Sequence, residues 1–529
     1  MRRLGCILLL MLAPGAAQAK WLEASSPHFV VYANGDPRNV QRFSEQLERF
    51  HEAMTDLLQV KSPPPSPSNR VTVYVVSSGE QVQKLAGDKT GMIYGFYLPR
   101  AGSSLAVVPS VGAGRGELQF SMIALLHEYA HHVTFTSTSA ALPMWMVEGM
   151  AEFFSSAKFN ADGSMEIARV AQHRGAELFQ ATNVPLKELL DPDMKERAKV
   201  RGRDNFYGRS WLLYHYLSLN KARAGQLNAY VVQINRGKGS LEAAQAAFGD
   251  LGQLEKELYR YMLGTMRMFK LDPIILPPGT VTLRDLSVGE AAMMSVRVQS
   301  KRGVDRKQAL ALLPAARQVA AQYPGDAAVL TALAEAEHDA GNEAEAIAAA
   351  DAALARDPKQ VNAYVQKGYA LFSKARALTD TREKTAAYQA ARKPFLDLNA
   401  IENDHPLPLI HYYLSFVEQG RPPGETGVAA LRRAVELAPF DLGLRMTLAV
   451  QDLRDGHMND AIGNLRPIAY NPHGGQMAAR VKALLTRVEG GATKDELFKN
   501  GKLDIEDGED GAGGEAGGEN AADGAQSGN

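Results

Sequence analysis

Residues 125–132 read Leu-Leu-His-Glu-Tyr-Ala-His-His, and they decide how the fold of this 529-residue chain is interpreted. They lie in an amphipathic stretch over about residues 117–135, which predicts a helix. Residues four apart on a helix are about 40° from each other around its axis, so His127 and His131 can direct two imidazoles at one point. Glu128 lies beside them, where its carboxylate can hold a bound water. This pattern predicts a metal site, and imidazoles with a carboxylate suit Zn²⁺.

A third ligand is needed, because two histidines alone make a poor catalytic site. Residues 142–153 read Leu-Pro-Met-Trp-Met-Val-Glu-Gly-Met-Ala-Glu-Phe, and Pro143 suits the start of a second helix. The Thr/Ser/Ala stretch before it can turn the chain. The second helix can therefore return antiparallel to the first and present Glu148 to the metal. Glu152, four residues later, is the competing ligand.

These residue types predict hydrolytic chemistry. A catalytic zinc keeps one coordination position for water and lowers the pKa of that water from about 15.7 toward about 7. Glu128 would accept the proton as the water attacks a carbonyl carbon, and would then pass it to the leaving amine. The same residues are compatible with a metal site that has no turnover, and with hydrolysis of a non-peptide carbonyl compound such as an ester.

His-Glu-x-x-His followed by Trp-x-x-Glu-Gly-x-Ala resembles the gluzincin clan of zinc metallopeptidases. The pattern is similar to that of aminopeptidase N relatives and closer to that of the short bacterial peptidase MA-like proteins. In this clan the glutamate of Glu-Gly-x-Ala is the third zinc ligand, which implies Glu148 here. Residues 207–210 read Tyr-Gly-Arg-Ser and are similar to the Tyr-x-Lys-Gly motif of the aminopeptidase group, with arginine and serine at the last two positions. The resemblance implies that Tyr207 donates a hydrogen bond to an oxyanion; the alternative is that it packs against its helix.

The resemblance extends over roughly residues 21–263 and implies an α+β gluzincin-like domain with a mixed sheet and active-site helices. In this clan an edge strand ahead of the metal helix pairs with the substrate backbone, and residues Leu105 to Val108 are the candidate. The aminopeptidase signature Gly-x-Met-Glu-Asn is absent, so both endopeptidase and exopeptidase action remain open.

The predicted peptidase domain has two parts, an α/β part over residues 20–110 and a helical zinc-binding part over residues 111–290. In the α/β part, apolar periodicity and turn residues predict one helix and four strands. The helix is about Val40–Leu58, and the strands are Phe29–Tyr32, Val71–Val76, Met92–Tyr97 and Leu105–Val108. The last two strands are predicted to form a hairpin.

The second half of the chain has a regular spacing of prolines. Prolines that can end helices occur at positions 324, 358, 406, 439 and 472, with spacings of 34, 48, 33 and 33 residues. A period of about 34 is typical of tetratricopeptide repeats, in which each unit is a pair of helices. Residues 300–490 are therefore predicted to be an all-α repeat solenoid, with an insertion near residues 378–387. An Ala-rich helical bundle is the alternative.

Both ends of the chain are predicted to lie outside the folded domains. Residues 1–19 contain Arg2 and Arg3, a short apolar run and a final Ala-Gln-Ala, which together indicate a signal peptide and a periplasmic or secreted protein. Cys6, the single cysteine, lies in this segment, so no disulfide is expected in the mature chain. Residues 491–529 are Gly-rich and acidic and are predicted to be disordered.

Composition restricts the possible partners. The formal net charge of −1 comes without a face-sized basic cluster, which argues against nucleic-acid binding. No internal stretch reaches about 18 continuous apolar residues, so no transmembrane span is expected. The sequence as a whole predicts an exported zinc-dependent peptidase whose repeats position a peptide or protein substrate, or bind a protein partner. The alternative is a periplasmic repeat scaffold or chaperone-like binder with a non-catalytic metal domain.

Overall fold

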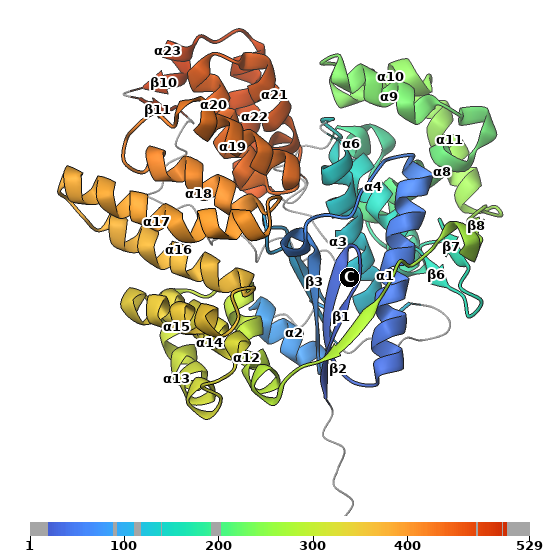
Figure 1. The fold of residues 1–529 in the computed structure, drawn as a ribbon. Coiled ribbons are helices and arrows are strands. Elements are labelled where there is room, and N and C mark those ends of the chain that lie inside the picture. The colour runs from blue at the N-terminus through green and yellow to red at the C-terminus, as the bar shows by residue number, and fades with distance from the viewer. Residues whose placement is uncertain are drawn as a thin grey trace, which may run out of the picture.

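The computed structural model describes residues 20–87, 93–109, 118–138, 140–191, 203–471, 474–499 and 501–504. An N-terminal α/β domain is followed by a helical domain that begins near residue 288. Figure 1 shows the helical domain curving along one side of the central sheet, from α12 to α22. The predicted signal peptide, residues 1–19, lies outside the described residues. Within the described ranges, no helix combines the length and the apolar composition of a membrane span.

A six-stranded mixed sheet forms the centre of the α/β domain. Its strands, in spatial order, are β4 (Phe96–Leu98), β5 (Leu105–Pro109), β3 (Val71–Val76), β2 (Phe29–Asn34), β1 (Trp21–Ser25) and β9 (Thr282–Asp285). Strands β2, β3 and β5 run parallel, whereas β4, β1 and β9 pair antiparallel with their neighbours. The predicted hairpin is confirmed, because β4 and β5 are antiparallel partners. Its first strand is shorter than the predicted Met92–Tyr97: residues 93–95 are not in a strand, and residue 92 lies outside the described residues.

Helices cover both faces of this sheet because its central strands carry apolar side chains on both sides. On one face, helices α1 (Pro37–Leu58) and α3 (Phe120–Ser137) pack against alternate residues of β2, β3 and β5. On the other face, helices α2 (Gly79–Ala86) and α12 (Val288–Arg302) pack against the intervening residues. The helix that carries the histidine motif therefore lies directly on the sheet.

Strand β1 was not predicted, and two further features of the sheet differ from the sequence-based expectation. The prediction that Leu105–Val108 is an edge strand is wrong, because these residues lie in β5 between β4 and β3. The short first strand of the hairpin, β4, lies on the outer side of β5 and forms this edge of the sheet. The opposite edge is β9, which comes from residues 282–285, far beyond the predicted sheet region. Its pairing with β1 joins segments distant in sequence, and no local pattern indicates it.

The helical part of the α/β domain is organised around α3, α4 (Met144–Ser155) and α8 (Phe206–Leu219). Helices α4 and α8 approach closely at Gly149, where a Cβ would lie 2.8 Å from the carbonyl carbon of Ser210. The remaining elements are β6 (Lys158–Phe159), β7 (Met165–Ile167), α5 (Gly175–Gln180), α6 (Leu186–Leu190), α9 (Gln226–Asn235), α10 (Ser240–Phe248), α11 (Leu251–Met262) and β8 (Phe269–Leu271). Strands β6, β7 and β8 form a small separate sheet.

The helical domain is a series of helix pairs, as the proline spacing predicts. After α12 its helices are α13 (Arg306–Gln322), α14 (Ala327–Asp339), α15 (Glu343–Arg356), α16 (Val361–Arg376), α17 (Thr381–Ile401), α18 (Pro406–Val417), α19 (Gly424–Leu437), α20 (Leu442–Asp455), α21 (Met458–Ala469) and α22 (Gly475–Glu489). Consecutive helices contact each other, and α14 also contacts α12 and α16, as in a tetratricopeptide-like solenoid. The 48-residue interval is one pair whose second helix, α17, has 21 residues.

The predicted disordered tail begins too early. Helix α23 (Lys494–Leu497) and a hairpin of β10 (Phe498–Lys499) and β11 (Lys502–Leu503) follow the last repeat helix. Leu497 is fully buried among side chains of α20, α21 and α22, so this segment is ordered by its few apolar residues. The remaining acidic stretch, residues 505–529, lies outside the described residues.

The close approach of α4 and α8 yields a stability prediction. Gly149→Ala should lower the free energy of unfolding by about 1–3 kcal/mol, because the added methyl must displace the α8 backbone rather than a flexible side chain. Urea denaturation of the full chain measures this change. Gly463→Ala, within α21, is the matched control, because a Cβ there has no heavy atom within 4 Å. Equal destabilisation by both substitutions would contradict the packing explanation.

Candidate metal centre

Helix α3 carries two histidines whose rings meet at a buried point. His127 and His131 have 5% and 4% of their surface exposed, and their Nε2 atoms lie 3.1 Å from each other. A neutral imidazole protonated at Nδ1 has its lone pair on Nε2. Two Nε2 atoms directed at one point are therefore the arrangement that a shared cation requires.

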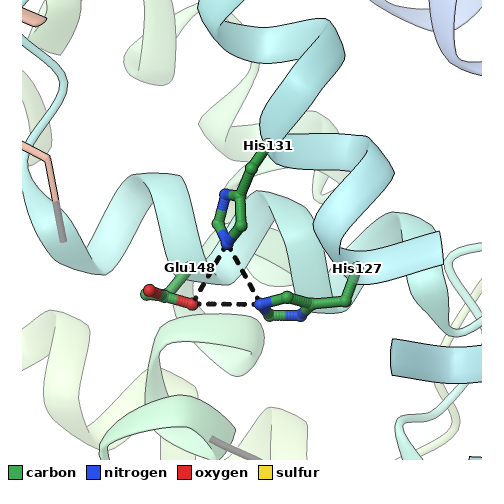
Figure 2. A group of neighbouring side chains, drawn as sticks. All are labelled: His127, His131 and Glu148. Atoms are coloured by element: carbon green, nitrogen blue, oxygen red, sulfur yellow. Dashed lines mark hydrogen bonds and ion pairs between the residues drawn. The ribbon is translucent and has the colours of Figure 1, made fainter. Parts of the chain in front are cut away.

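Helix α4 brings Glu148 to the same point, and Figure 2 shows the three side chains converging. Oε2 of Glu148 lies 3.3 Å from Nε2 of His127 and 3.7 Å from Nε2 of His131. Glu148 is fully buried, and the ligand atoms of the three residues all lie within 4.8 Å of one another. The structure thus brings together the three residues that the sequence selects as ligands.

Glu152, the competing ligand, lies on the other side of the His127 ring. Its Oε1 is 3.2 Å from Nδ1 of His127, the ring nitrogen that is not shared with Glu148. The same carboxylate accepts a hydrogen bond from Nη2 of Arg174 at 2.5 Å and contacts Nε2 of His173 at 2.6 Å. By accepting from Nδ1–H, Glu152 orients the imidazole and leaves Nε2 for the shared point.

Burial and two carboxylates set the protonation of this centre. Burial opposes a positive charge on His127, but hydrogen bonds to Glu148 and Glu152 outweigh it and raise the pKa of His127 to about 10. Burial also opposes the charge of Glu152, yet Arg174 and His173 hold the pKa of this carboxyl well below its usual range. A cation that binds Nε2 of His127 must therefore displace a proton at neutral pH.

Glu128, the predicted general base, is half-buried on α3 and follows His127 directly. Its charge acts on Tyr97 of β4. Burial raises the pKa of the Tyr97 phenol, a hydrogen bond with Ser104 lowers it, and the negative charge of Glu128 raises it further. Glu128 therefore adjoins the proposed ligand His127 in the chain, and its charge is felt at Tyr97 on the edge strand.

Tyr207, the predicted oxyanion donor, lies at the start of α8 and is 5% exposed. The guanidinium carbon of Arg174 is 4.9 Å from the centroid of the Tyr207 ring. Because Arg174 also binds Glu152, Tyr207 is connected to the centre through this arginine. Its role toward an oxyanion stays a prediction.

A cleft of about 250 Å³ lies beside the centre. Ile123, one turn before His127 on α3, forms part of its wall, and so does His173, which contacts Glu152. Ser155 and Ser156, where α4 ends, also line this wall, and their hydroxyls donate to the carbonyl oxygen of Glu152. The cleft therefore offers apolar and polar contacts, and it reaches the centre through His173, the partner of Glu152.

Sequence reasoning did not identify His173 and Arg174 as part of the centre. They follow Glu152 by 21 and 22 residues and reach it from a short turn after β7. No motif links a buried acid to basic residues at such a distance. The identity of the partners of Glu152 therefore emerges only from the folded chain.

A second group of possible ligands in the described ranges is a weaker candidate. It consists of Asp452, His457 and Asp460, of which the last two are exposed. Asp452 already forms an ion pair with Arg432, with Oδ1 and Nη2 2.5 Å apart. A cation there would compete with the guanidinium, so the buried group on α3 and α4 is the better metal site.

One protein family matches the part of the chain that contains the candidate metal centre. The family described as "Protein of unknown function (DUF1570)" matches residues 122–237, a segment that includes His127, Glu148 and Tyr207. A comparison with curated proteins finds no match.

Solved structures similar to this chain include a TPR protein and MamA. The thermophilic TPR protein TTC0263 of Thermus thermophilus is 16% identical over 38% of this chain and 99% of its own, with a TM-score of 0.32. MamA from Desulfovibrio magneticus RS-1 is 16% identical over 39% of this chain and 96% of its own, with a TM-score of 0.26. These scores are too low to assign a fold, so the repeat architecture rests on the helix pairing within this chain.

The two carboxylates around His127 should differ in their effect on zinc binding. Glu148→Ala should abolish stoichiometric zinc binding, whereas Glu152→Gln should weaken it by about 10–100-fold, because it removes only the partner that orients His127. Competition with a chromogenic chelator measures both affinities. Glu177→Gln is the matched control, because Glu177 also contacts Arg174, at 3.3 Å, without contacting His127. The assignment is reversed if Glu152→Gln abolishes zinc binding while Glu148→Ala retains it.

Proposed function

We propose that this protein is a zinc-dependent hydrolase of peptide bonds. The main support is the convergence of His127, His131 and Glu148 at one buried point, with Glu128 next to them on α3. Three protein ligands leave a fourth tetrahedral position for water, and this donor number is typical of catalytic rather than structural zinc. The resemblance of both motifs to gluzincin peptidases supports a peptide bond as the target.

The residues fit Zn²⁺ in their chemistry. Two imidazole nitrogens and one carboxylate oxygen are donors that zinc prefers over calcium or magnesium, which take oxygen ligands. The buried carboxylate of Glu148 faces two imidazoles, and burial of its charge requires a positive partner. Glu152 on Nδ1 of His127 matches the carboxylate–histidine arrangement that commonly supports a zinc ligand.

Each residue has a distinct role in the proposed reaction. When bound, zinc would polarise the substrate carbonyl and lower the pKa of a water molecule. Glu128 would accept the proton of the attacking water and deliver it to the leaving nitrogen. Glu152 would hold the proton on Nδ1 of His127, so that Nε2 becomes available once its own proton has left. Tyr207 is proposed to donate a hydrogen bond to the oxygen on which negative charge develops.

The substrate is proposed to be a peptide or protein outside the cytoplasm. Export rests on the sequence of residues 1–19, which has the charge, apolar run and small-residue end of a signal peptide. The cleft beside the metal centre, with apolar and hydroxyl-bearing walls, supports binding of an extended chain that carries both kinds of side chain.

Replacing the general base gives the direct test. Glu128→Gln should retain one zinc per chain and lower kcat for a peptide library by about 10²–10⁴-fold, because it removes only the proton acceptor. Metal analysis and mass spectrometry of cleavage products measure the two effects. Glu188→Gln, an exposed position on α6, is the matched control and should leave both unchanged. Full turnover in the zinc-loaded Glu128→Gln protein would exclude this mechanism.

A protein-binding scaffold is the second candidate function. The tetratricopeptide-like helix pairs favour it, because repeat solenoids expose extended surfaces for protein partners. The two candidates differ in their response to Glu128→Gln, which stops hydrolysis but leaves a scaffold intact. Removing the repeats does not separate them, because Asn69 and Ala101 of the α/β domain are buried against the repeats. Point variants of the full chain are therefore required.

A further inference from the structure

The turn of the β4–β5 hairpin, residues 99–104, is bound by the helical repeats. The amide of Ala101 donates to Oδ2 of Asp441, at the start of α20, over 2.9 Å. The guanidinium of Arg100 donates to the carbonyl oxygens of residues 301 and 302, at the end of α12, over 3.1 and 3.0 Å. The hairpin turn therefore bridges the first repeat helix and one near the end of the series.

The turn is shaped for this contact. Gly102 has a φ of +69°, a conformation that residues with a Cβ rarely adopt, and a Cβ there would lie 2.8 Å from Cε1 of His405. Ala101 is 5% exposed and belongs to an apolar cluster with Phe440 and other repeat side chains. The contact is thus a packed interface and not only a set of polar bonds.

A second loop of the α/β domain joins the hairpin to the same repeats. The amide and the hydroxyl of Ser68 both donate to the carboxylate of Glu402, over 2.9 and 2.8 Å. Nδ2 of Asn69 donates to the carbonyl oxygen of Leu437 over 2.5 Å, and its Oδ1 accepts from the amide of Gly102 over 3.0 Å. Asn69 therefore ties the hairpin turn to the repeats from a separate segment.

These contacts lie on the side of the solenoid that faces the sheet domain, as the curve of the helices in Figure 1 shows. Burial lowers the pKa of Arg100, and Tyr369, Asp441 and Glu335 act against that shift. Groups on α14, α16 and at the start of α20 thus act on the charge of one arginine. Repeat solenoids commonly bind extended segments on their concave surface. Here a segment of the same chain occupies that surface.

The hairpin contacts both the repeats and the helix that carries Glu128, the proposed general base. The phenol of Tyr97, on β4, is hydrogen-bonded to Nδ1 of His132 over 2.6 Å. Phe440 packs on the same imidazole, with ring centroids 4.4 Å apart. His132 and Glu128 are four residues apart on α3 and so lie on one side of the helix. The repeats therefore contact the helix that carries Glu128 and the turn that follows β4.

We propose that the inner face of the repeats is an intramolecular clamp for the β4–β5 hairpin, which makes Tyr97 and His132 positioning residues for Glu128. The catalytic part of this inference rests on the proposed peptidase function, whereas the clamp itself does not. At the clamp the solenoid surface is covered by the chain's own hairpin, so a protein partner would bind the repeats outside this contact.

Asp441 allows the clamp to be opened without uncapping a helix. Its Oδ1 accepts from the amide of Leu444 over 2.9 Å and caps α20, while its Oδ2 binds Ala101. Asp441→Ser keeps a capping hydroxyl but is too short to reach Ala101 as well. Amide hydrogen exchange across residues 96–105 of the zinc-loaded full chain should accelerate at least about 10-fold, because a charge-assisted hydrogen bond is lost.

Asp380→Ser is the matched control, because Asp380 caps α17 through the amide of Glu383 over 2.8 Å on the exposed side of the repeats. This variant should leave exchange across residues 96–105 unchanged. Unchanged exchange in Asp441→Ser, or equal acceleration in both variants, would overturn the clamp.

The positioning role is tested at His132, which does not depend on the stability of α20. His132→Asn retains an acceptor near the place of Nδ1 for the Tyr97 hydroxyl, whereas His132→Leu removes it. At full zinc occupancy His132→Leu should lower kcat about 10-fold with little change in KM and accelerate exchange in β4, and His132→Asn should restore both. Equal kcat and equal exchange in the two variants would overturn the role of this pair. A wild-type protein that cleaves no peptide would refute the peptidase function, and exchange would still decide the clamp.

Discussion

The imidazole of His127, held between two buried carboxylates, is the interaction on which the rest of the site depends. Glu152 on Nδ1 fixes the orientation of the ring, and Glu148 shares the point at which Nε2 is directed. Each carboxylate would be costly to bury alone. Glu152 is therefore paired with Arg174, and Glu148 needs positive charge at the shared point. A proton on His127 supplies part of that charge, and a divalent cation would supply it more fully.

This arrangement requires α3 and α4 to be fixed relative to each other within a fraction of an ångström. The close approach of α4 to α8 at Gly149 sets one side, and the packing of α3 on the sheet sets the other. The helical repeats add a third restraint, because Phe440 packs on His132 and Asp441 binds the hairpin that carries Tyr97. The repeats thus pack directly on elements that hold the candidate metal centre in place.

Local patterns located strands β2 to β5, helices α1, α3 and α4 and the series of repeat helices, and they failed where distant segments meet. Turn residues and apolar runs predicted the hairpin of β4 and β5. They did not predict that β4 lies outside β5 and is therefore the edge strand. Strand β9 and the ordered segments 494–499 and 501–504 were also missed, because a few side chains such as Leu497 find apolar partners only in the folded chain.

The sequence by itself determined the ligand types and their spacing. Residues four apart on one helix share a face, so the spacing alone predicts that His127 and His131 lie side by side. Only the tertiary structure distinguishes Glu148 from Glu152, because both lie on the same helix and only the position of α4 against α3 determines which ring nitrogen of His127 each carboxylate faces. It also decided what covers the inner face of the repeats, since contacts between segments more than 300 residues apart leave no periodic trace in the chain.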